Sequence, residues 1–403
     1  MKAKKSLRVI GFMRLAVILI ASFSLFDHAK AASPPGAKTL MVGALFSLTG
    51  PAAPAVKEAR DGAILAAEWI NGKGGITVKG QRYVIEVVAE DDKSSPDAAV
   101  AATNKLVYKD KVKFIVGPVV PQCGIVMAPI TEEAKVIRCN VNGTGTPAEI
   151  NPNLRYTFAT YKNVNHIAPA YDYFVESYPK AKKVAIMGPD DPGGQGAAPV
   201  SRKEANKRGL EVVFTELYPF GTEDFYPILT KALDQKPDAI DMTVGITPWF
   251  AGIIKQARQL GFKGPMFTSC PTGDIYLLRN IIGKDFAYNM FFMEPDLKSP
   301  KMTPIIQEIK KWVRDKYGIE AQYAHAAGWE ALWVTAQAIE AAQSLDTTAV
   351  AQSWEKMKSI ETLYGKGRMG GLETFGINHV IIKPVPVTRL KDGEVEFVKF
   401  ISY

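Results

Sequence analysis

The most constraining feature of this chain is a strand–helix–strand pattern between residues 113 and 146. Phe114–Val116 is a short apolar run that ends at Gly117-Pro118, which is typical of a strand buried on both faces. Apolar residues at roughly helical spacing follow, and residues 135–139 predict the next strand. Because a connection of this length joins parallel strands, the pattern predicts an α/β sheet with helices between its strands.

The ends of these two strands predict a place where a small ligand binds. Ligands of open α/β sheets bind beyond the carboxyl ends of the strands. One loop there opens a helix, and the other is rich in Gly and Thr, at Asn142, Gly143, Thr144 and Gly145. Together they can hold an anion such as a carboxylate through backbone N–H groups, without a charged side chain. The alternative is that both loops are ordinary turns between strands and helices.

Residues 1–31 predict a targeting segment that is removed from the mature protein. Basic residues precede and enter the apolar run Leu15–Phe26, and Ala29-Lys30-Ala31 fits a cleavage site of small residues. The run is short for a membrane span, so an uncleaved anchor is the less favoured alternative. We therefore expect an exported protein located in the periplasm.

The charge and length of the mature chain narrow its class. The full sequence has a formal net charge of +8, but residues 1–31 hold six Lys or Arg and one acid, which leaves about +3 for the mature chain. This mild excess, without a basic run, argues against nucleic acid and membrane surfaces as partners. The remaining roughly 370 residues suit two domains of ordinary size.

The three cysteines allow at most one internal disulfide. Cys123 and Cys139 are expected near the ends of the two neighbouring strands, so they are the candidate pair. Two free buried thiols are an equally acceptable alternative.

A second series of alternating strands and helices follows residue 160 and predicts a second doubly wound sheet. Predicted strands cover 183–187, 211–217, 239–244, 265–268 and 287–293, with helices at 194–208, 225–234 and 248–260. Near the C-terminus, Lys391-Asp392-Gly393 separates two apolar runs, which is a hairpin signal.

Several short motifs occur in an order that resembles a known family. They are Thr49-Gly50-Pro51, Asp61-Gly62-Ala63, Ile70–Ile76 (INGKGGI), Glu90-Asp91-Asp92 and Phe114–Gly117. In this order and at these separations they resemble the periplasmic binding proteins of branched-chain amino-acid-type ABC transporters. The resemblance covers essentially the whole mature chain.

The resemblance implies a type I periplasmic binding fold, with two Rossmann-like α/β lobes joined by three crossing segments. Carried over, the crossings fall near Phe158–Lys162, Phe292–Pro295 and Tyr364–Gly371. Residues 32–160 and 294–365 would form the first lobe, and residues 161–293 and 366–403 the second. The implied function is to close on a small ligand and deliver it to an ABC permease, without any cofactor.

An enzyme is the alternative class of function, and the sequence does not favour it. The histidines, at positions 28, 166, 325 and 379, show no metal-ligand spacing. Cys270 has no His placed locally to activate it as a nucleophile. The chain contains neither a Gly-x-Ser-x-Gly elbow nor a Walker loop. We therefore predict no catalytic residue and no metal site.

The resemblance also implies where the ligand would bind, and there the chain departs from its family. The carboxylate-binding positions correspond to Gln122, Cys123 and Gly143–Gly145, with compatible residue types. Gly193 replaces an aromatic residue of the family. Cys270 stands where an acid commonly meets the ligand's ammonium, and a neutral thiol cannot replace that charged partner.

Other side chains near the strand ends remain open to two interpretations. Asp274 or Glu294 could supply the missing acid, or each could be a helix cap or hinge residue. The aromatic residues expected in strand-end loops could line a pocket or pack beneath the loops; they are Phe46, Trp249, Phe250 and Tyr276.

The sequence thus favours a carboxylate without an α-ammonium as the ligand, with an apolar or aromatic body. The alternatives are an aliphatic or branched-chain amino acid, and a ligand sensor that hands the closed form to a receptor instead of a permease.

Overall fold

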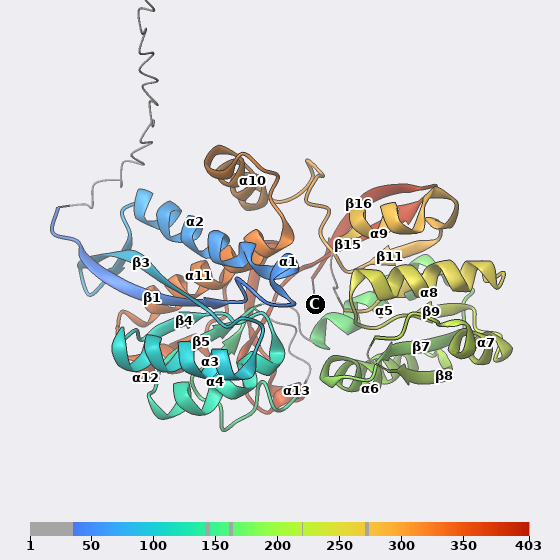
Figure 1. The fold of residues 1–403 in the computed structure, drawn as a ribbon, viewed down its shortest axis with the longest axis horizontal. Helices are drawn as coiled ribbons and strands as arrows, with labels where there is room; N and C mark the ends of the chain where they lie inside the picture. The colour runs from blue at the N-terminus through green and yellow to red at the C-terminus, as the bar shows by residue number, and fades with distance from the viewer. Residues whose placement is uncertain (1–34, 142–145, 161–163, 220, 271–273, 403) are drawn as a thin grey trace, which may run out of the picture.

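The computed structural model has two α/β lobes that lie side by side (Figure 1). It describes the 403-residue chain except for residues 1–34, 142–145, 161–163, 220, 271–273 and 403. The predicted targeting segment and the loop residues Asn142, Gly143, Thr144 and Gly145 therefore lie outside the described residues. Within the described part of the chain, no helix combines the length and the apolar character that crossing a membrane requires.

The first lobe is built on a sheet whose described strands number nine, in the order β12-β13-β14-β6-β5-β4-β1-β3-β2. In that order they are Ile360–Thr362, Gly365–Gly370, Val380–Ile382, Thr157–Ala159, Ile137–Asn140, Phe114–Val116, Lys38–Phe46, Gln81–Asp91 and Ile76–Val78. The run from β14 to β3 is parallel, and the outer strands at both edges are antiparallel. All three residues of β4 are fully buried, which confirms the prediction of a strand that is buried on both faces.

The second lobe is built on a sheet with seven described strands, in the order β16-β15-β11-β10-β9-β7-β8. In that order they are Glu394–Ile401, Val385–Lys391, Met290–Phe292, Met266–Thr268, Ala239–Asp241, Lys183–Pro189 and Glu211–Tyr218. The run from β11 to β8 is parallel. The predicted hairpin is confirmed, because β15 and β16 are antiparallel across a turn in which Asp392 and Gly393 both have positive φ.

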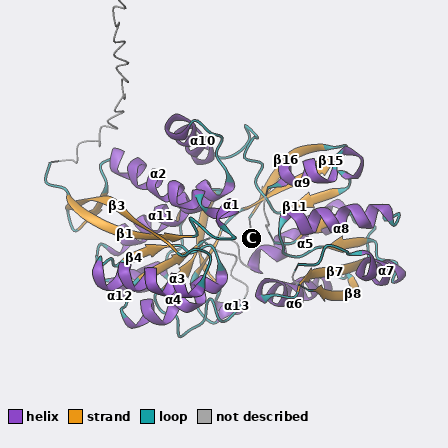
Figure 2. Cartoon of the chain, in the orientation of Figure 1, coloured by secondary structure: helices purple, strands orange, loops and turns teal. Residues whose placement is uncertain are grey.

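Helices cover both faces of each sheet (Figure 2). In the first lobe α2, α10, α11 and α12 pack on one face and α3 and α4 on the other, while α1 and α13 are single turns. These helices span Ala53–Val56 (α1), Glu58–Gly72 (α2), Pro96–Asn104 (α3), Pro121–Glu133 (α4), Pro304–Tyr317 (α10), Tyr323–Ala342 (α11), Thr347–Trp354 (α12) and Leu372–Phe375 (α13), and a π-helix spans Lys105–Lys109.

In the second lobe α5 and α6 pack on one face of the sheet, and α7, α8 and α9 on the other. They span Ile167–Ser177 (α5), Pro192–Lys207 (α6), Tyr226–Asp234 (α7), Thr247–Gln259 (α8) and Ile275–Ile282 (α9), and short 3-10 turns span Val164–His166 and Lys284–Phe286. The two sheets are predominantly parallel and carry helices on both faces, which confirms the predicted doubly wound fold class.

The chain passes between the two sheets three times. The first two expected crossings lie where the chain leaves β6 and β11. The third differs from the expectation at Tyr364–Gly371, because β13 and β14 still pair within the first sheet. The chain joins the second sheet only at β15, so we propose a boundary between Ile382 and Val385 in place of residues 365 and 366. Gly-rich β13 (GKGRMG) has no apolar period that predicts its pairing.

Two glycines set the closest helix packing in the first lobe. A Cβ on Gly62 of α2 would lie 2.0 Å from the carbonyl oxygen of His325, and a Cβ on Gly328 of α11 would lie 1.9 Å from that of Ala59. Each helix therefore presses its backbone against the glycine of the other, and neither position has room for a side chain.

We expect Gly328→Ala to lower the free energy of unfolding by about 3 kcal/mol, because the added methyl group must push two helix backbones apart. Gly72→Ala is the matched control, since a Cβ there meets nothing within 4 Å. Urea unfolding measures both. Equal midpoints for the two variants would show that the helices are not held in contact at Gly328.

Candidate ligand-binding site

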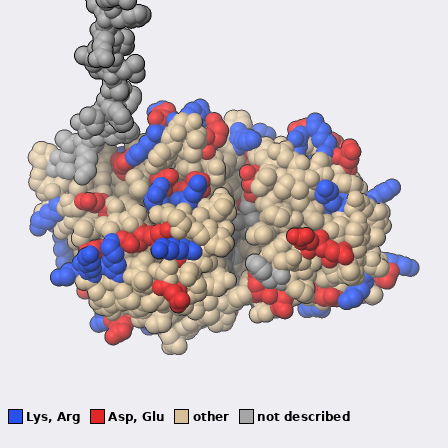
Figure 3. Space-filling view, in the orientation of Figure 1, with Lys and Arg blue, Asp and Glu red and all other residues tan. Residues whose placement is uncertain are grey.

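The two sheets turn their C-terminal strand ends toward each other. The crossings leave β6 and β11 at the C-terminal ends of these strands, and parallel neighbours end at the same edge of a sheet. The loops after β1, β4 and β5 in the first lobe therefore face those after β7, β9 and β10 in the second. Figure 3 shows the surface hollowed between the lobes, so this space is the candidate site.

The first lobe offers the N-terminus of α4 at this edge. Gly117, with a φ of 102°, lies so close to β1 that a Cβ would be 2.0 Å from the carbonyl oxygen of Leu45. The N-cap residue Val120 makes no side-chain hydrogen bond to the helix. The first-turn N–H groups of Gln122 and Cys123 are thus not capped by a side chain, and Gln122 is exposed. This helix end can receive an anion.

The side chain of Cys123 itself is fully buried beside a carboxyl group. Asp92 accepts a hydrogen bond of 2.5 Å from the Ser47 hydroxyl, and burial raises the pKa of Asp92 although this bond partly offsets it. Burial, together with the Asp92 charge, raises the pKa of the Cys123 thiol to about 12. At neutral pH Cys123 is therefore a neutral thiol, so its backbone N–H is the group of this residue that could bind an anion.

Asn140, the last residue of β5, was not among the predicted site residues. Asn140 is 1% exposed, and neither polar atom of its amide has a hydrogen-bond partner among the described residues. The amide lies beneath the first turn of α4, where its nitrogen would be 3.8 Å from a Cβ on Gly124. A polar residue closing an otherwise buried strand, Ile137–Asn140, is the signal that points to it.

Two neighbouring glycines in the second lobe differ in how much space the structure leaves for a side chain. A Cβ on Gly194 would lie 1.9 Å from the carbonyl oxygen of Pro189, so α6 can meet the end of β7 only with glycine there. Asp191 caps α6 by accepting the N–H of Gly194 at 2.8 Å. At Gly193 the nearest atoms are the Asp191 carboxylate at 3.1 Å and Val244 at 3.7 Å. A Cβ at position 193 would therefore meet only side chains, and the Asp191 carboxylate would have to shift by a few tenths of an ångström.

The remaining predicted residues of the second lobe lie at the same edge. Trp249, in the first turn of α8, is 8% exposed and meets the ring of Tyr218 edge-on at 5.9 Å between centroids. Cys270 follows β10, is 5% exposed, and donates its backbone N–H to Thr243. Their contributions to ligand binding stay predictions.

The two acids considered as substitutes for Cys270 have structural partners. Asp274 is the N-cap of α9, and its Oδ1 accepts the N–H groups of Tyr276 at 2.8 Å and Leu277 at 3.1 Å. Glu294 is 2% exposed and lies in the second crossing. The structure thus shows the helix-cap and hinge positions that the sequence left open.

Phe46 was considered as a pocket-lining residue, and Cys123 and Cys139 as a disulfide pair; the structure shows neither arrangement. Phe46 is 0% exposed in the core of the first lobe, so the structure gives it the packing role. None of the three cysteines, all of which are described, forms a disulfide, and all three are buried. Cys123 packs with α3 and α4, whereas Cys139 packs with α2 and α11 on the opposite face of the sheet. The sheet separates the two thiols, which explains why the candidate disulfide is not formed.

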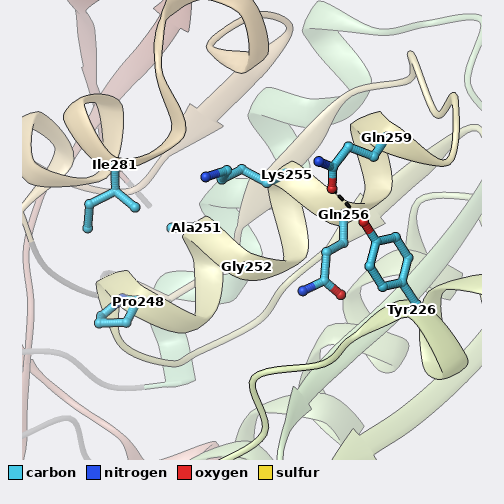
Figure 4. A pocket seen from close by; sticks show the side chains of 8 residues that line it. All are labelled: Tyr226, Pro248, Ala251, Gly252, Lys255, Gln256, Gln259 and Ile281. Carbon is cyan, nitrogen blue, oxygen red and sulfur yellow. Dashed lines mark hydrogen bonds between the residues drawn. The ribbon is translucent and has the colours of Figure 1, made fainter.

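A separate groove runs along the outer surface of α8 (Figure 4), where Tyr226 donates a 2.6 Å hydrogen bond to Gln259. Its lining residues are Tyr226, Pro248, Ala251, Gly252, Lys255, Gln256, Gln259 and Ile281. None of the predicted site residues lines this groove. Within the described residues, no cluster of three or more His, Cys, Asp or Glu side chains could hold a metal ion.

Comparisons with known proteins agree on one family. A profile of the family described as periplasmic binding protein matches residues 39–394. The leucine-, isoleucine-, valine-, threonine- and alanine-binding protein of Pseudomonas aeruginosa is 27% identical over 84% of this chain and 86% of its own length. These matches are with binding proteins, which confirms the prediction that the chain is not an enzyme.

Solved structures share the two-lobed fold. A leucine-binding protein of Thermotoga maritima superposes with a TM-score of 0.70 at 24% identity, covering 90% of this chain and 99% of that one. A solute-binding protein of Rhodopseudomonas palustris, solved with 4-hydroxybenzoate, gives 0.71 at 21% identity, covering 91% and 97%.

We expect Gly193→Phe to keep the melting temperature of the protein and to weaken its binding of small carboxylates at least roughly tenfold, because the ring would fill space at the strand ends. The matched change Gly194→Ala should instead lower the melting temperature, since its methyl group meets backbone. Thermal unfolding and calorimetric titration separate the two effects. Wild-type affinity in a folded Gly193→Phe protein would place the ligand elsewhere.

Proposed function

The chain belongs to the periplasmic binding protein family, and on this premise we propose that it is an extracytoplasmic solute-binding protein that closes its lobes on a small carboxylate and delivers it to an ABC permease. The predicted targeting segment at residues 1–31 supports export to the periplasm. The facing strand ends support a ligand held between the lobes, because a ligand drives closure only when it binds the closed state better.

The uncapped N-terminus of α4 supports a carboxylate as the group held by the first lobe. The first-turn N–H groups and the helix dipole favour a negative charge there. In the described part of this edge, the buried acid Asp92 already accepts hydrogen bonds from Ser47 and Ser94. The arrangement therefore receives an anion without a cationic side chain.

The ligand class is proposed from Cys270, which by the family resemblance stands where an acid would meet an α-ammonium. Asp274 is occupied as the cap of α9, and Glu294 is buried in the second crossing. An ammonium enclosed without an anionic partner costs several kcal/mol. A cost of about 3 kcal/mol weakens binding by roughly two orders of magnitude. We propose an apolar or aromatic acid that lacks the ammonium.

Related proteins support both this class and its competitor. Solute-binding proteins of Rhodopseudomonas palustris were solved with 4-hydroxybenzoate and with 3,4-dihydroxybenzoic acid. The Pseudomonas aeruginosa relative is named for amino acids. An aliphatic amino acid is therefore the second candidate, and it requires either Asp274 to leave its cap or Glu294 to reach the ammonium. Ligand sensing through a receptor uses the same closure and is the alternative to transport.

A thermal-shift comparison of matched compounds tests the ligand class. We expect benzoate, phenylpropanoate or 4-methylpentanoate to raise the melting temperature, because their carboxylates bind without an ammonium that needs a partner. Phenylalanine and leucine, at the same concentrations, serve as the matched compounds that add the ammonium. Stabilisation by the amino acids alone would overturn the proposal.

Closure itself is tested by small-angle X-ray scattering of the wild-type protein at saturating ligand. We expect the radius of gyration to fall on binding, because the lobes approach each other about the three crossings. Addition of a compound that causes no thermal shift is the control. A radius that stays constant with a bound ligand would refute ligand-driven closure.

A further inference from the structure

A buried ion pair fastens the third crossing to the first lobe. Lys383 lies in the two-residue link between β14 and β15, and its ammonium pairs with the Glu330 carboxylate of α11. The two side chains are 1% and 0% exposed. The second carboxylate oxygen of Glu330 accepts the N–H of Leu363 at 3.0 Å. Because a buried charge cannot leave its partner without a large penalty, Lys383 moves with the first lobe.

The other side of this link belongs to the second lobe. Val385 begins β15 and pairs with Ile401. Bending of the third crossing is therefore confined to Pro384, the one residue between the ion pair and the sheet. A pivot this short makes the orientation of the lobes sensitive to any contact beside it.

The second crossing, in contrast to the third, is held mainly by hydrogen bonds to the second lobe. The Thr388 hydroxyl of β15 donates to the carbonyl oxygen of Glu294 at 2.6 Å, and the Tyr276 hydroxyl of α9 donates to Asp296 at 2.6 Å. Gln307 of α10 then donates to the carbonyl oxygen of Ser299 at 3.0 Å. The second crossing is therefore bonded to the second lobe as far as Asp296, and it is bonded to the first lobe from Ser299 onward.

An aromatic contact spans the lobes beside the pivot. Tyr364, in the turn between β12 and β13, stacks on Phe400 of β16 with 5.9 Å between ring centroids and 29° between planes. The Lys383 ammonium lies 5.2 Å from the centroid of the Tyr364 ring. The ion pair thus holds Tyr364, which belongs to the first lobe, against Phe400, which belongs to the second lobe.

We propose that Lys383, Glu330, Tyr364 and Phe400 form a brace that stabilises the open orientation of the lobes, in which the surface between them is hollowed (Figure 3). The inference rests on the proposed function, because it concerns the closure that binding requires. These are positioning residues, and none of them is among the predicted ligand contacts. Weakening the brace raises the fraction of closed protein, and the apparent affinity rises with that fraction.

Phe400→Ala tests the brace by removing the contact from the second lobe. We expect the protein without ligand to show a smaller radius of gyration in scattering, and benzoate to bind roughly threefold more tightly in calorimetry, as the loss of one aromatic contact implies. Phe400→Tyr, which keeps the ring, should retain both wild-type values. Lys399→Met is the matched control on the same strand, because Lys399 pairs with Glu176 inside the second lobe.

Three further variants keep the test decisive. Tyr364→Leu removes the same contact from the first lobe if Phe400→Ala does not fold. Lys383→Met combined with Glu330→Gln removes the charges together while keeping an acceptor for Leu363, and should shift the radius in the same direction. Lys383→Met alone should lower the melting temperature more than the double variant does, because it leaves a buried charge unpaired.

A folded Phe400→Ala protein with the wild-type radius of gyration would overturn the brace, whether or not its affinity changes. Failure of wild-type protein to bind benzoate would instead count against the proposed ligand class. The scattering of the protein without ligand would still decide the brace in that case, so the two failures are distinguishable.

Discussion

Parallel strand pairing is the constraint on which the site depends. It brings the C-terminal ends of neighbouring strands to one edge of each sheet. The first two crossings leave β6 and β11 from those same ends, so the two edges must face each other. Loops that would otherwise be separate turns then become the two walls of one site. Helix N-termini collect there for the same reason, since each helix begins where a parallel strand ends.

The sequence predicted the strands that are buried on both faces, because such strands leave continuous apolar runs such as Phe114–Val116. It predicted the hairpin at Asp392-Gly393, because the turn requires residues that tolerate positive φ. The interleaving of the lobes came from the family resemblance. The third crossing was misplaced, because the pairing of β13 and β14 is a long-range choice that a short glycine-rich strand does not encode locally.

The candidate site was less predictable, since one residue type can serve different physical needs. Gly193 and Gly194 are indistinguishable in sequence, yet only a Cβ on Gly194 would strike backbone. Cys123 follows β4 and Cys139 lies in the adjacent strand β5, but the side-chain alternation of β5 directs Cys139 away from the face that α4 covers. Asp274 precedes a helix, which predicts a cap, and the structure shows that cap.

The affinity of such a two-lobed protein is the product of two quantities, the affinity of the closed form and the fraction of closed protein, and different parts of the structure determine each. In the proposed function, the strand-end loops determine how strongly the closed lobes hold a carboxylate. The crossings determine what fraction of the protein is closed before the ligand arrives, and an affinity measured from outside contains both. In the proposed function, the thiol at position 270 acts on the first quantity, because it removes the partner that an ammonium requires. In the proposed brace, the buried pair Lys383–Glu330 acts on the second, because it holds Tyr364 against Phe400. Ligand selectivity can therefore change at Cys270 without a change in closure, and closure can change at the crossings without a change in selectivity.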